Sequence, residues 1–238
     1  MKKAPFLIVL MAALVLFMGC SGGDKPGENN SSSNKSEETS ENLLQINFNV
    51  EGNEIELEKY ETQNPVAALY VKGYGAIVIE LYPDVAPNTV NNFISLIKKG
   101  FYDNNTIHRM QPGFVIQGGD PTGTGRGDPG YSIIGEFASN GFVNNLSHAK
   151  GVVSMARSSN GFDTAGCQFF IMLGDAPSLD GDYAAFGRVI DGFSNCEEIA
   201  KIKYYSLPLG ILNENLVITK AVVDTKGKSY PEPETLLG

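Results

Sequence analysis

The chain has 238 residues, with 27 acidic and 18 basic side chains and a formal net charge of −9 at pH 7. Duplex nucleic-acid binders carry a basic surplus that neutralises phosphates, so this balance argues against nucleic acid as a partner. Three cysteines cannot build a disulfide framework, and the 27 glycines and 12 prolines follow no collagen-like period. With 42% apolar residues the chain can bury a core, and its length predicts about one to two domains.

The first 19 residues have the organisation of a secretory signal peptide. Lys2 and Lys3 give a positive start, and residues 6–18 then form an uninterrupted apolar run. This run is shorter than the ~20 residues that a helix needs to cross a bilayer. A charged start and a short apolar centre are typical of a signal peptide. The alternative, a buried N-terminal helix, is disfavoured because no polar face interrupts the run.

Residues 16–20, Leu-Phe-Met-Gly-Cys, resemble the lipobox of bacterial lipoproteins, in which the cysteine is acylated and becomes the mature N-terminus. Gly19 fits this pattern, whereas Phe17 replaces the usual Leu and Met18 the usual small residue. The resemblance implies lipidation of Cys20, and two acyl chains suffice for stable anchoring. We therefore expect a mature chain that is tethered to the cell membrane on its extracytoplasmic face.

Two segments of contrasting composition follow the lipobox. Residues 21–42 contain no member of the apolar set and are rich in Ser, Asn and Glu, which predicts a disordered linker over 20–42. Such a linker would hold the next domain roughly 25 Å from the membrane. Residues 43–64 instead alternate apolar and polar side chains from Leu44 to Leu57. This period of two predicts an N-terminal β extension, as a hairpin or a pair of edge strands.

Residues 65–226 are expected to form one domain with many short strands and two helices. Apolar side chains at 90, 93, 94 and 97 predict a helix that opens near Pro87 and ends at Gly100. Many short strands with few helices indicate a mainly β, closed antiparallel sheet, because closure removes exposed edges. The polar residues 227–238 are expected to form a loose tail. The second helix is predicted over 194–202, and strands are predicted at 65–71, 76–81, 114–117, 152–155, 168–173, 184–190 and 216–223.

The polar residues of this domain match no metal or nucleotide motif. His108 and His148 are far apart, with no nearby Cys or His to complete a zinc site, so no metal is expected. Cys167 and Cys196 are interpreted as free buried thiols, although a bond between them stays open. The Gly-rich segment 118–130 lacks the lysine of a Walker loop and the helix that follows a dinucleotide fingerprint. We interpret it as an irregular surface loop with several positive-φ glycines.

A series of short motifs occurs in order along residues 65–226. They are Ile107-His108-Arg109, Pro112-Gly113-Phe114, Gln117-Gly118-Gly119-Asp120, Ser154-Met155-Ala156, Gln168-Phe169-Phe170, Leu179-Asp180-Gly181 and Phe186-Gly187-Arg188-Val189. This series resembles the cyclophilin family of peptidyl-prolyl cis-trans isomerases. The resemblance implies a closed eight-stranded antiparallel barrel capped by two α-helices, which agrees with the strand pattern. It also implies an isomerase that needs no cofactor.

The resemblance further implies roles for individual residues. Arg109 matches the catalytic arginine, and Gln117 matches the residue that orients this arginine and the substrate carbonyl. Ser178 stands where cyclosporin-sensitive members carry Trp, which implies weak cyclosporin binding with isomerase activity kept. The residues expected to bind substrate are His108, Phe114, Val115, Ala156, Arg157, Gln168, Phe170, Leu179 and Tyr183.

Two functions from different classes follow from these observations. The first is a lipid-anchored isomerase that accelerates X–Pro rotation in exported proteins, with Arg109 stabilising the twisted amide. The alternative is a proline-peptide-binding scaffold or chaperone with little turnover; the presence of Arg109 and Gln117 favours the enzyme. The expected partners are proline-containing peptides and unfolded exported proteins, and we expect a monomer that binds no nucleic acid.

Overall fold

The computed structural model of the protein describes residues 55–206 and 209–236. The predicted signal peptide, Cys20, the predicted linker and residues 43–54 lie outside the described residues, so the structure does not test the predictions made for them. The described residues belong to one compact unit, Glu51–Gly238. They form two α-helices and nine strands: α1 (Pro87–Lys98), α2 (Phe193–Ile199), β1 (Val66–Val71), β2 (Gly75–Leu81), β3 (Asn105–Gln111), β4 (Val115–Asp120), β5 (Val152–Met155), β6 (Phe169–Met172), β7 (Ala185–Asp191), β8 (Tyr204–Ser206) and β9 (Ile211–Asp224).

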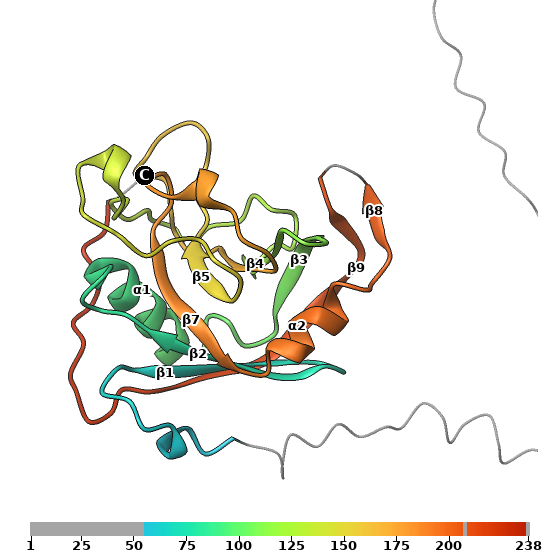
Figure 1. Cartoon of the computed structure of the whole chain (residues 1–238), viewed down its shortest axis with the longest axis horizontal. Coiled ribbons are helices and arrows are strands. Elements are labelled where there is room, and N and C mark those ends of the chain that lie inside the picture. The colour runs from blue at the N-terminus through green and yellow to red at the C-terminus, as the bar shows by residue number, and fades with distance from the viewer. Residues whose placement is uncertain (1–54, 207–208, 237–238) are drawn as a thin grey trace, which may run out of the picture. The chain divides into compact units, whose positions relative to one another are not determined.

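Eight of these strands close into an antiparallel barrel (Figure 1). Neighbouring strands follow the order β1-β2-β7-β5-β6-β4-β3-β9, and β1 pairs with β9 to complete the ring. The predicted fold class, a closed eight-stranded antiparallel barrel with two α-helices, is therefore confirmed. β8 pairs with β9 and adds a short ninth strand to the sheet. Among the described residues, no helix combines the length and the apolar character needed to span a bilayer.

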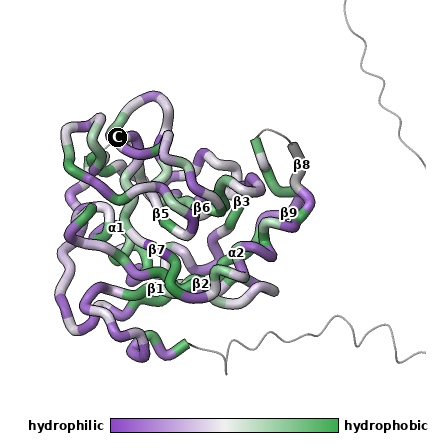
Figure 2. Tube along the Cα trace, in the orientation of Figure 1, coloured by the Kyte–Doolittle hydropathy of each residue, from purple (hydrophilic) through white to green (hydrophobic). Residues whose placement is uncertain are grey.

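β1 is buried on both of its faces. Ala67, Leu69 and Val71 belong to the core cluster inside the barrel, and the residues between them belong to a second apolar cluster. Because side chains alternate across a strand, this second cluster lies on the outer face of the sheet. Leu57 belongs to it as well and reaches it from a 3₁₀ turn, η1 (Leu57–Lys59). The tube is correspondingly green along much of β1 and β2 (Figure 2).

The predicted N-terminal β extension over 43–64 is wrong for its described part. Residues 55–64 contain the turn η1 and no strand. Leu57 is only 5% exposed because it covers the outer face of β1. Ile55, Leu57 and Tyr60 all pack on this outer cluster from a segment without a strand, so apolar–polar alternation does not by itself identify a strand.

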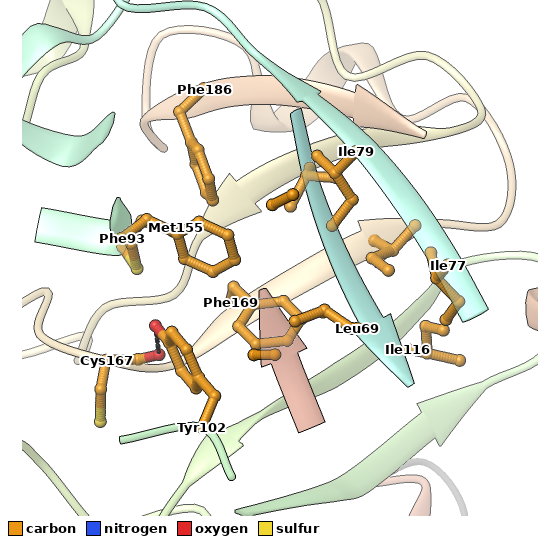
Figure 3. Packing of buried hydrophobic residues seen from close by; sticks show 14 of the residues in the cluster. Leu69, Ile77, Ile79, Phe93, Tyr102, Ile116, Met155, Cys167, Phe169 and Phe186 are labelled. Carbon is orange, nitrogen blue, oxygen red and sulfur yellow. Dashed lines mark hydrogen bonds between the residues drawn. The ribbon is translucent and has the colours of Figure 1, made fainter. Parts of the chain in front are cut away.

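The interior of the barrel is filled by aromatic and aliphatic side chains (Figure 3). The ring of Phe93, on α1, lies 5.2 Å from the ring of Tyr102, 5.6 Å from that of Phe169 and 5.1 Å from that of Phe186. The hydroxyl of Tyr102 donates to the backbone carbonyl of Cys167 at 2.8 Å, so the one polar group of this ring cluster is satisfied. The lumen is thus a packed core, and any ligand site must lie outside it.

The strand pattern missed β3 and β8 and placed the start of β9 at 216 rather than 211. β3 carries five polar or charged residues among its seven, which hides its alternation. Its pairing with β4 also shifts register between Thr106 and Ile107 and again between Ile107 and Arg109. Each bulge changes the face to which the following side chains point, so no strict period of two survives.

The C-terminal segment 227–236 is not the loose tail that was expected. Glu232 accepts hydrogen bonds from Lys99 Nζ and Ser95 Oγ, both at 2.7 Å. The backbone N–H of Glu234 donates to Asn88 Oδ1 at 2.8 Å. These partners lie on or next to α1, along which the segment runs (Figure 1). Polar residues are held here because the polar side of α1 offers them acceptors and donors.

Candidate active site

The candidate site lies on the outer face of the barrel, over β4, β6 and β5. Phe169 and Ile171 of β6 belong to the barrel core, whereas Phe170 and Met172 belong to a separate apolar cluster. Alternation along the strand therefore turns Phe170 outward. Val115, from the neighbouring strand β4, joins the same outer cluster, so the two strands together build an apolar floor.

A cavity of about 150 Å³ opens above this floor. Its wall carries two arginine side chains and one carboxamide, and the rest is aromatic or aliphatic. All of its lining residues are among the site residues expected from the sequence, which come from six separate segments of the chain. They are Arg109, Phe114, Val115, Gln117, Ala156, Arg157, Phe170, Leu179 and Tyr183. The barrel thus brings these residues together, while their individual roles stay predictions.

The guanidinium of Arg109 is held from three sides. Its Nε donates to the backbone carbonyl of Leu209 at 2.9 Å, its Nη1 donates to Gln117 Oε1 at 3.1 Å, and its Nη2 donates to Gln111 Oε1. Burial lowers the pKa of Arg109, but the ordinary pKa of a guanidinium is so high that the group stays cationic at neutral pH. The result is a fixed positive charge at the edge of an apolar cavity.

Two of these anchors, Leu209 and Gln111, were not expected from the sequence. Leu209 contributes only its backbone carbonyl, a group that every residue has, so its identity carries no signal. The approach of its hairpin to β3 depends on Gly210, which has φ +69°; a Cβ there would lie 2.2 Å from the carbonyl oxygen of Met110. Only glycine permits this contact, and that glycine is the one feature that could have suggested it.

A chain of carboxamides fixes the orientation of Gln117. Its Oε1 accepts from Arg109, and its Nε2 donates to Gln168 Oε1 at 3.0 Å. Gln168 Nε2 in turn donates to the carbonyl of Gly127 at 2.9 Å. Every amide in this chain has a defined direction because each has one donor and one acceptor partner. Gln168, expected to contact substrate, thus supports Gln117 and lines a second, neighbouring cavity of about 400 Å³.

The side chain of Arg157 also lines the cavity of about 150 Å³. Its guanidinium carbon lies 4.8 Å from the centre of the Tyr183 ring and within 5.4 Å of the rings of Phe137 and Phe162. Its Nε also donates to the carbonyl of Asp182 at 2.9 Å. Such stacking on aromatic faces suits the planar guanidinium. Arg157, expected to bind substrate, thus lines the cavity with a side chain whose guanidinium is packed against three aromatic rings.

His108 does not reach the cavity, contrary to the expectation that it binds substrate. It is 3% exposed, and its ring lies behind the loop 118–130, where a Cβ on Gly125 would be 3.7 Å from Nε2. The pairing of β3 with β4 shifts register between Ile107 and Arg109, so that Arg109, and not His108, is the residue paired with Gln117. Burial lowers the pKa of His108, so its ring is neutral at pH 7.

The loop 118–130 is organised by a buried carboxylate. Asp120 accepts the backbone N–H groups of Thr122, Thr124 and Arg126 at 2.7 to 3.0 Å. Burial alone would raise the pKa of Asp120, but these donors and their neighbours lower it to about 2. The glycines at 119, 123, 125 and 130 have positive φ, as expected for an irregular loop. The loop binds its own aspartate, so its glycines do not need a phosphate to explain them.

Cys167 and Cys196 are both free and buried, as expected. Burial raises the pKa of each thiol to about 12, which keeps both protonated and unreactive at pH 7. Over residues 55–206 and 209–236, no three His, Cys, Asp or Glu side chains gather into a set that could hold a metal ion.

Fold and site together define a closed antiparallel β-barrel protein with a small apolar ligand cavity on its outer face and a fixed arginine beside it. Residues 66–223 match the model of the cyclophilin type peptidyl-prolyl cis-trans isomerase family. The chain belongs to this family, and it is a peptidyl-prolyl cis-trans isomerase.

Curated relatives and solved structures agree with this membership. The chain is 47% identical over 149 residues to the peptidyl-prolyl cis-trans isomerase ppi1 of Schizosaccharomyces pombe, which covers 62% of this chain and 92% of that protein. It is 49% identical over 116 residues to peptidyl-prolyl cis-trans isomerase B of Bacillus subtilis, and this alignment covers 49% of this chain and 77% of that protein. A cyclophilin type isomerase of Cryptosporidium parvum, crystallised in the presence of the dipeptide Ala-Pro, aligns with a TM-score of 0.60 at 31% identity, covering 67% of this chain and 98% of that one.

Proposed function

We propose that the chain accelerates X–Pro rotation without a covalent step and that Arg109 is the catalytic residue. The observation that carries this proposal is the guanidinium held by three protein acceptors at the rim of an apolar cavity of about 150 Å³. We infer that a cavity of this size receives one small apolar ring and that the cation beside it donates to the nitrogen of that ring.

The chemistry needs a donor that acts only during rotation. Twisting a prolyl bond removes amide resonance and costs about 18–20 kcal/mol. At the perpendicular geometry the proline nitrogen becomes pyramidal and regains a lone pair, which can accept a hydrogen bond from Arg109. This bond does not form with the planar amide, so it stabilises the transition state selectively. No nucleophile, metal or cofactor is required because no bond breaks.

One hydrogen bond to a charged group contributes about 1.5–3 kcal/mol, which is too little alone. The remainder would come from the cavity, where Phe114, Phe170 and Leu179 hold the proline ring away from water while the preceding carbonyl rotates. Gln117 would keep the guanidinium aimed and contact the substrate carbonyl. Proline-containing peptides and unfolded exported proteins are the substrates that we propose.

An exchange experiment separates this enzyme from the alternative scaffold. The purified full chain is added in catalytic amount to an Ala-Pro peptide, and cis–trans interconversion is followed by NMR exchange or a protease-coupled assay. Acceleration by the wild type that is lost in Arg109→Ala, with peptide binding retained, supports the proposal. Binding without acceleration would favour the scaffold, and near-normal turnover by Arg109→Ala would remove Arg109 from the mechanism.

We also propose that the isomerase acts at the extracytoplasmic face of the membrane as a lipid-anchored monomer. Support comes from the sequence: the signal-peptide pattern over 1–19, the lipobox-like run ending at Cys20, and the polar linker over 20–42. The anchor would place the barrel near polypeptides as they emerge from the membrane. Mass spectrometry of the mature N-terminus should find a diacylated Cys20 in a bacterial host, and Cys20→Ser should release the protein into the medium or periplasm. An unmodified N-terminus would refute the anchor.

A further inference from the structure

A buried histidine lies directly beneath the candidate site and has no role in the mechanism above. His148 is 1% exposed. Its Nδ1 lies 2.8 Å from Asp180 Oδ1, and its Nε2 lies 3.0 Å from the hydroxyl of Ser154. The geometry looks like a hydrolase triad, but Ser154 is fully buried and cannot meet a substrate. These three side chains must therefore act on the site through their neighbours.

The charges around His148 select one tautomer. Burial alone would raise the pKa of Asp180, but donors from His148 and Ser147 outweigh it and lower the pKa, so Asp180 is ionised at pH 7. Burial lowers the pKa of His148, so the ring is neutral. An ionised carboxylate only accepts hydrogen bonds. Nδ1 must then carry the ring proton, and Nε2 must accept a hydrogen bond from the hydroxyl of Ser154.

His148 connects two parts of the cavity wall, the floor at Phe170 and the segment that carries Leu179. Its ring stacks on Phe170 with centroids 6.0 Å apart and an interplanar angle of 20°. Ser154, which it holds through Nε2, is the cross-strand partner of Phe170 between β5 and β6. Asp180 directly follows Leu179, and it also accepts the backbone N–H of His148 at 2.7 Å. The floor at Phe170 and the segment that carries Leu179 are thus joined through the ring of His148.

We propose that His148 is a positioning residue of the isomerase. Through its hydrogen bonds to Ser154 and Asp180 it holds Phe170 and Leu179 at a fixed position relative to Arg109. This inference rests on the proposed function, since it assigns Phe170 and Leu179 to the grip on the proline ring. His148 makes no contact with the substrate. Its effect is to keep the floor at a fixed place relative to the cation.

Such a role predicts a specific kinetic signature. Rotation requires the ring nitrogen to meet a guanidinium whose position is fixed independently by three acceptors. A floor that moves would misplace the nitrogen mainly in the twisted state, whereas the planar peptide can still settle into the cavity. Loss of the His148 contacts should therefore lower kcat and leave KM nearly unchanged.

Ser154→Ala tests this with a minimal change, because it removes only the hydroxyl that Nε2 accepts from. Thr219→Val is the matched control: it also removes one hydroxyl, which donates to the carbonyl of Tyr70 at 3.1 Å on the β1–β9 side of the barrel. We expect Ser154→Ala to lower kcat about tenfold with KM changed less than about twofold, and Thr219→Val to leave both unchanged. Asp180→Asn keeps an acceptor for Nδ1 and should retain most of the activity that Asp180→Ala loses.

A spectroscopic measurement complements the kinetics. The chain has only two histidines, so the ring nitrogen signals of His148 can be assigned by their loss in His148→Phe. The full chain at pH 7 should show the Nδ1–H tautomer at this position. Observation of the Nε2–H tautomer would overturn the inference, as would kinetics of Ser154→Ala that equal those of the control, or a rise in KM at constant kcat. An inactive wild type would instead refute the proposed function itself.

Discussion

Replacement of Arg109 by lysine tests the central physical claim, because it keeps the charge and removes the planar fork. A guanidinium has five N–H donors. Among the described residues, Leu209, Gln117 and Gln111 accept from three of them, which leaves two that can face the cavity. A lysine ammonium has three donors on one tetrahedral nitrogen, so it cannot satisfy these separate acceptors and still donate to a proline nitrogen.

The expected cost is that of one hydrogen bond to a charged group, about 1.5–3 kcal/mol, or about a 10- to 150-fold loss of kcat/KM. The assay is NMR exchange on an Ala-Pro peptide, with urea unfolding to confirm that the variant is folded. Arg188→Lys is the control, since Arg188 is exposed on β7 and donates only a 3.3 Å bond to the carbonyl of Lys150 among the described residues. If folded Arg109→Lys retains activity within about twofold of the wild type, the planar fork is not what stabilises the twisted amide.

Three further predictions concern the surroundings of this arginine. Gln117→Leu removes the acceptor of Arg109 Nη1 and should lower kcat/KM about tenfold without unfolding the barrel, as measured by the same exchange assay. The pKa of Asp120 is lowered to about 2, so its carboxylate stabilises the fold at pH values above the ordinary carboxyl pKa, and this stabilisation is lost as the pH falls toward 2. Asp120→Asn should therefore lower the free energy of unfolding by about 2 kcal/mol at pH 7 and by much less near pH 2, as measured by urea unfolding. Ser178 is exposed in the 3₁₀ turn Pro177–Leu179, next to Leu179 of the cavity wall. Calorimetry should find weak cyclosporin binding to the wild type and an affinity at least about tenfold higher in Ser178→Trp, because an indole adds apolar contact area at this position. An unchanged affinity would contradict this explanation.

Much of the fold was determined by local patterns in the sequence. The apolar stripe of α1 and the short apolar-rich runs of β1, β2 and β5 to β7 predicted those elements, because a helix that buries one face repeats its apolar residues with its own period and a buried strand is a short apolar run bounded by turns. The family motifs then carried the site, and all residues that line the proline-sized cavity were among those expected. Phe170 shows why both levels agree: Phe170 and Met172, two of the four apolar residues of β6, face outward because the residues alternating with them, Phe169 and Ile171, fill the core.

Tertiary structure alone decided the features that depend on residues far apart in the chain. The carbonyl of Leu209 holds Arg109 across 100 positions of sequence, and a backbone group has no residue identity to detect. His108 is buried outside the cavity although it stands next to Arg109, and the register shift of β3 at this point cannot be read from the local sequence. The link from Asp180 through His148 to Ser154 likewise exists only because the closed barrel brings two loop segments and the strand β5 to one place. Sequence determined which chemical groups were present and which faces they occupied; closure of the barrel determined which of them meet, since contact between distant segments is a property of the packed sheet and not of any local period.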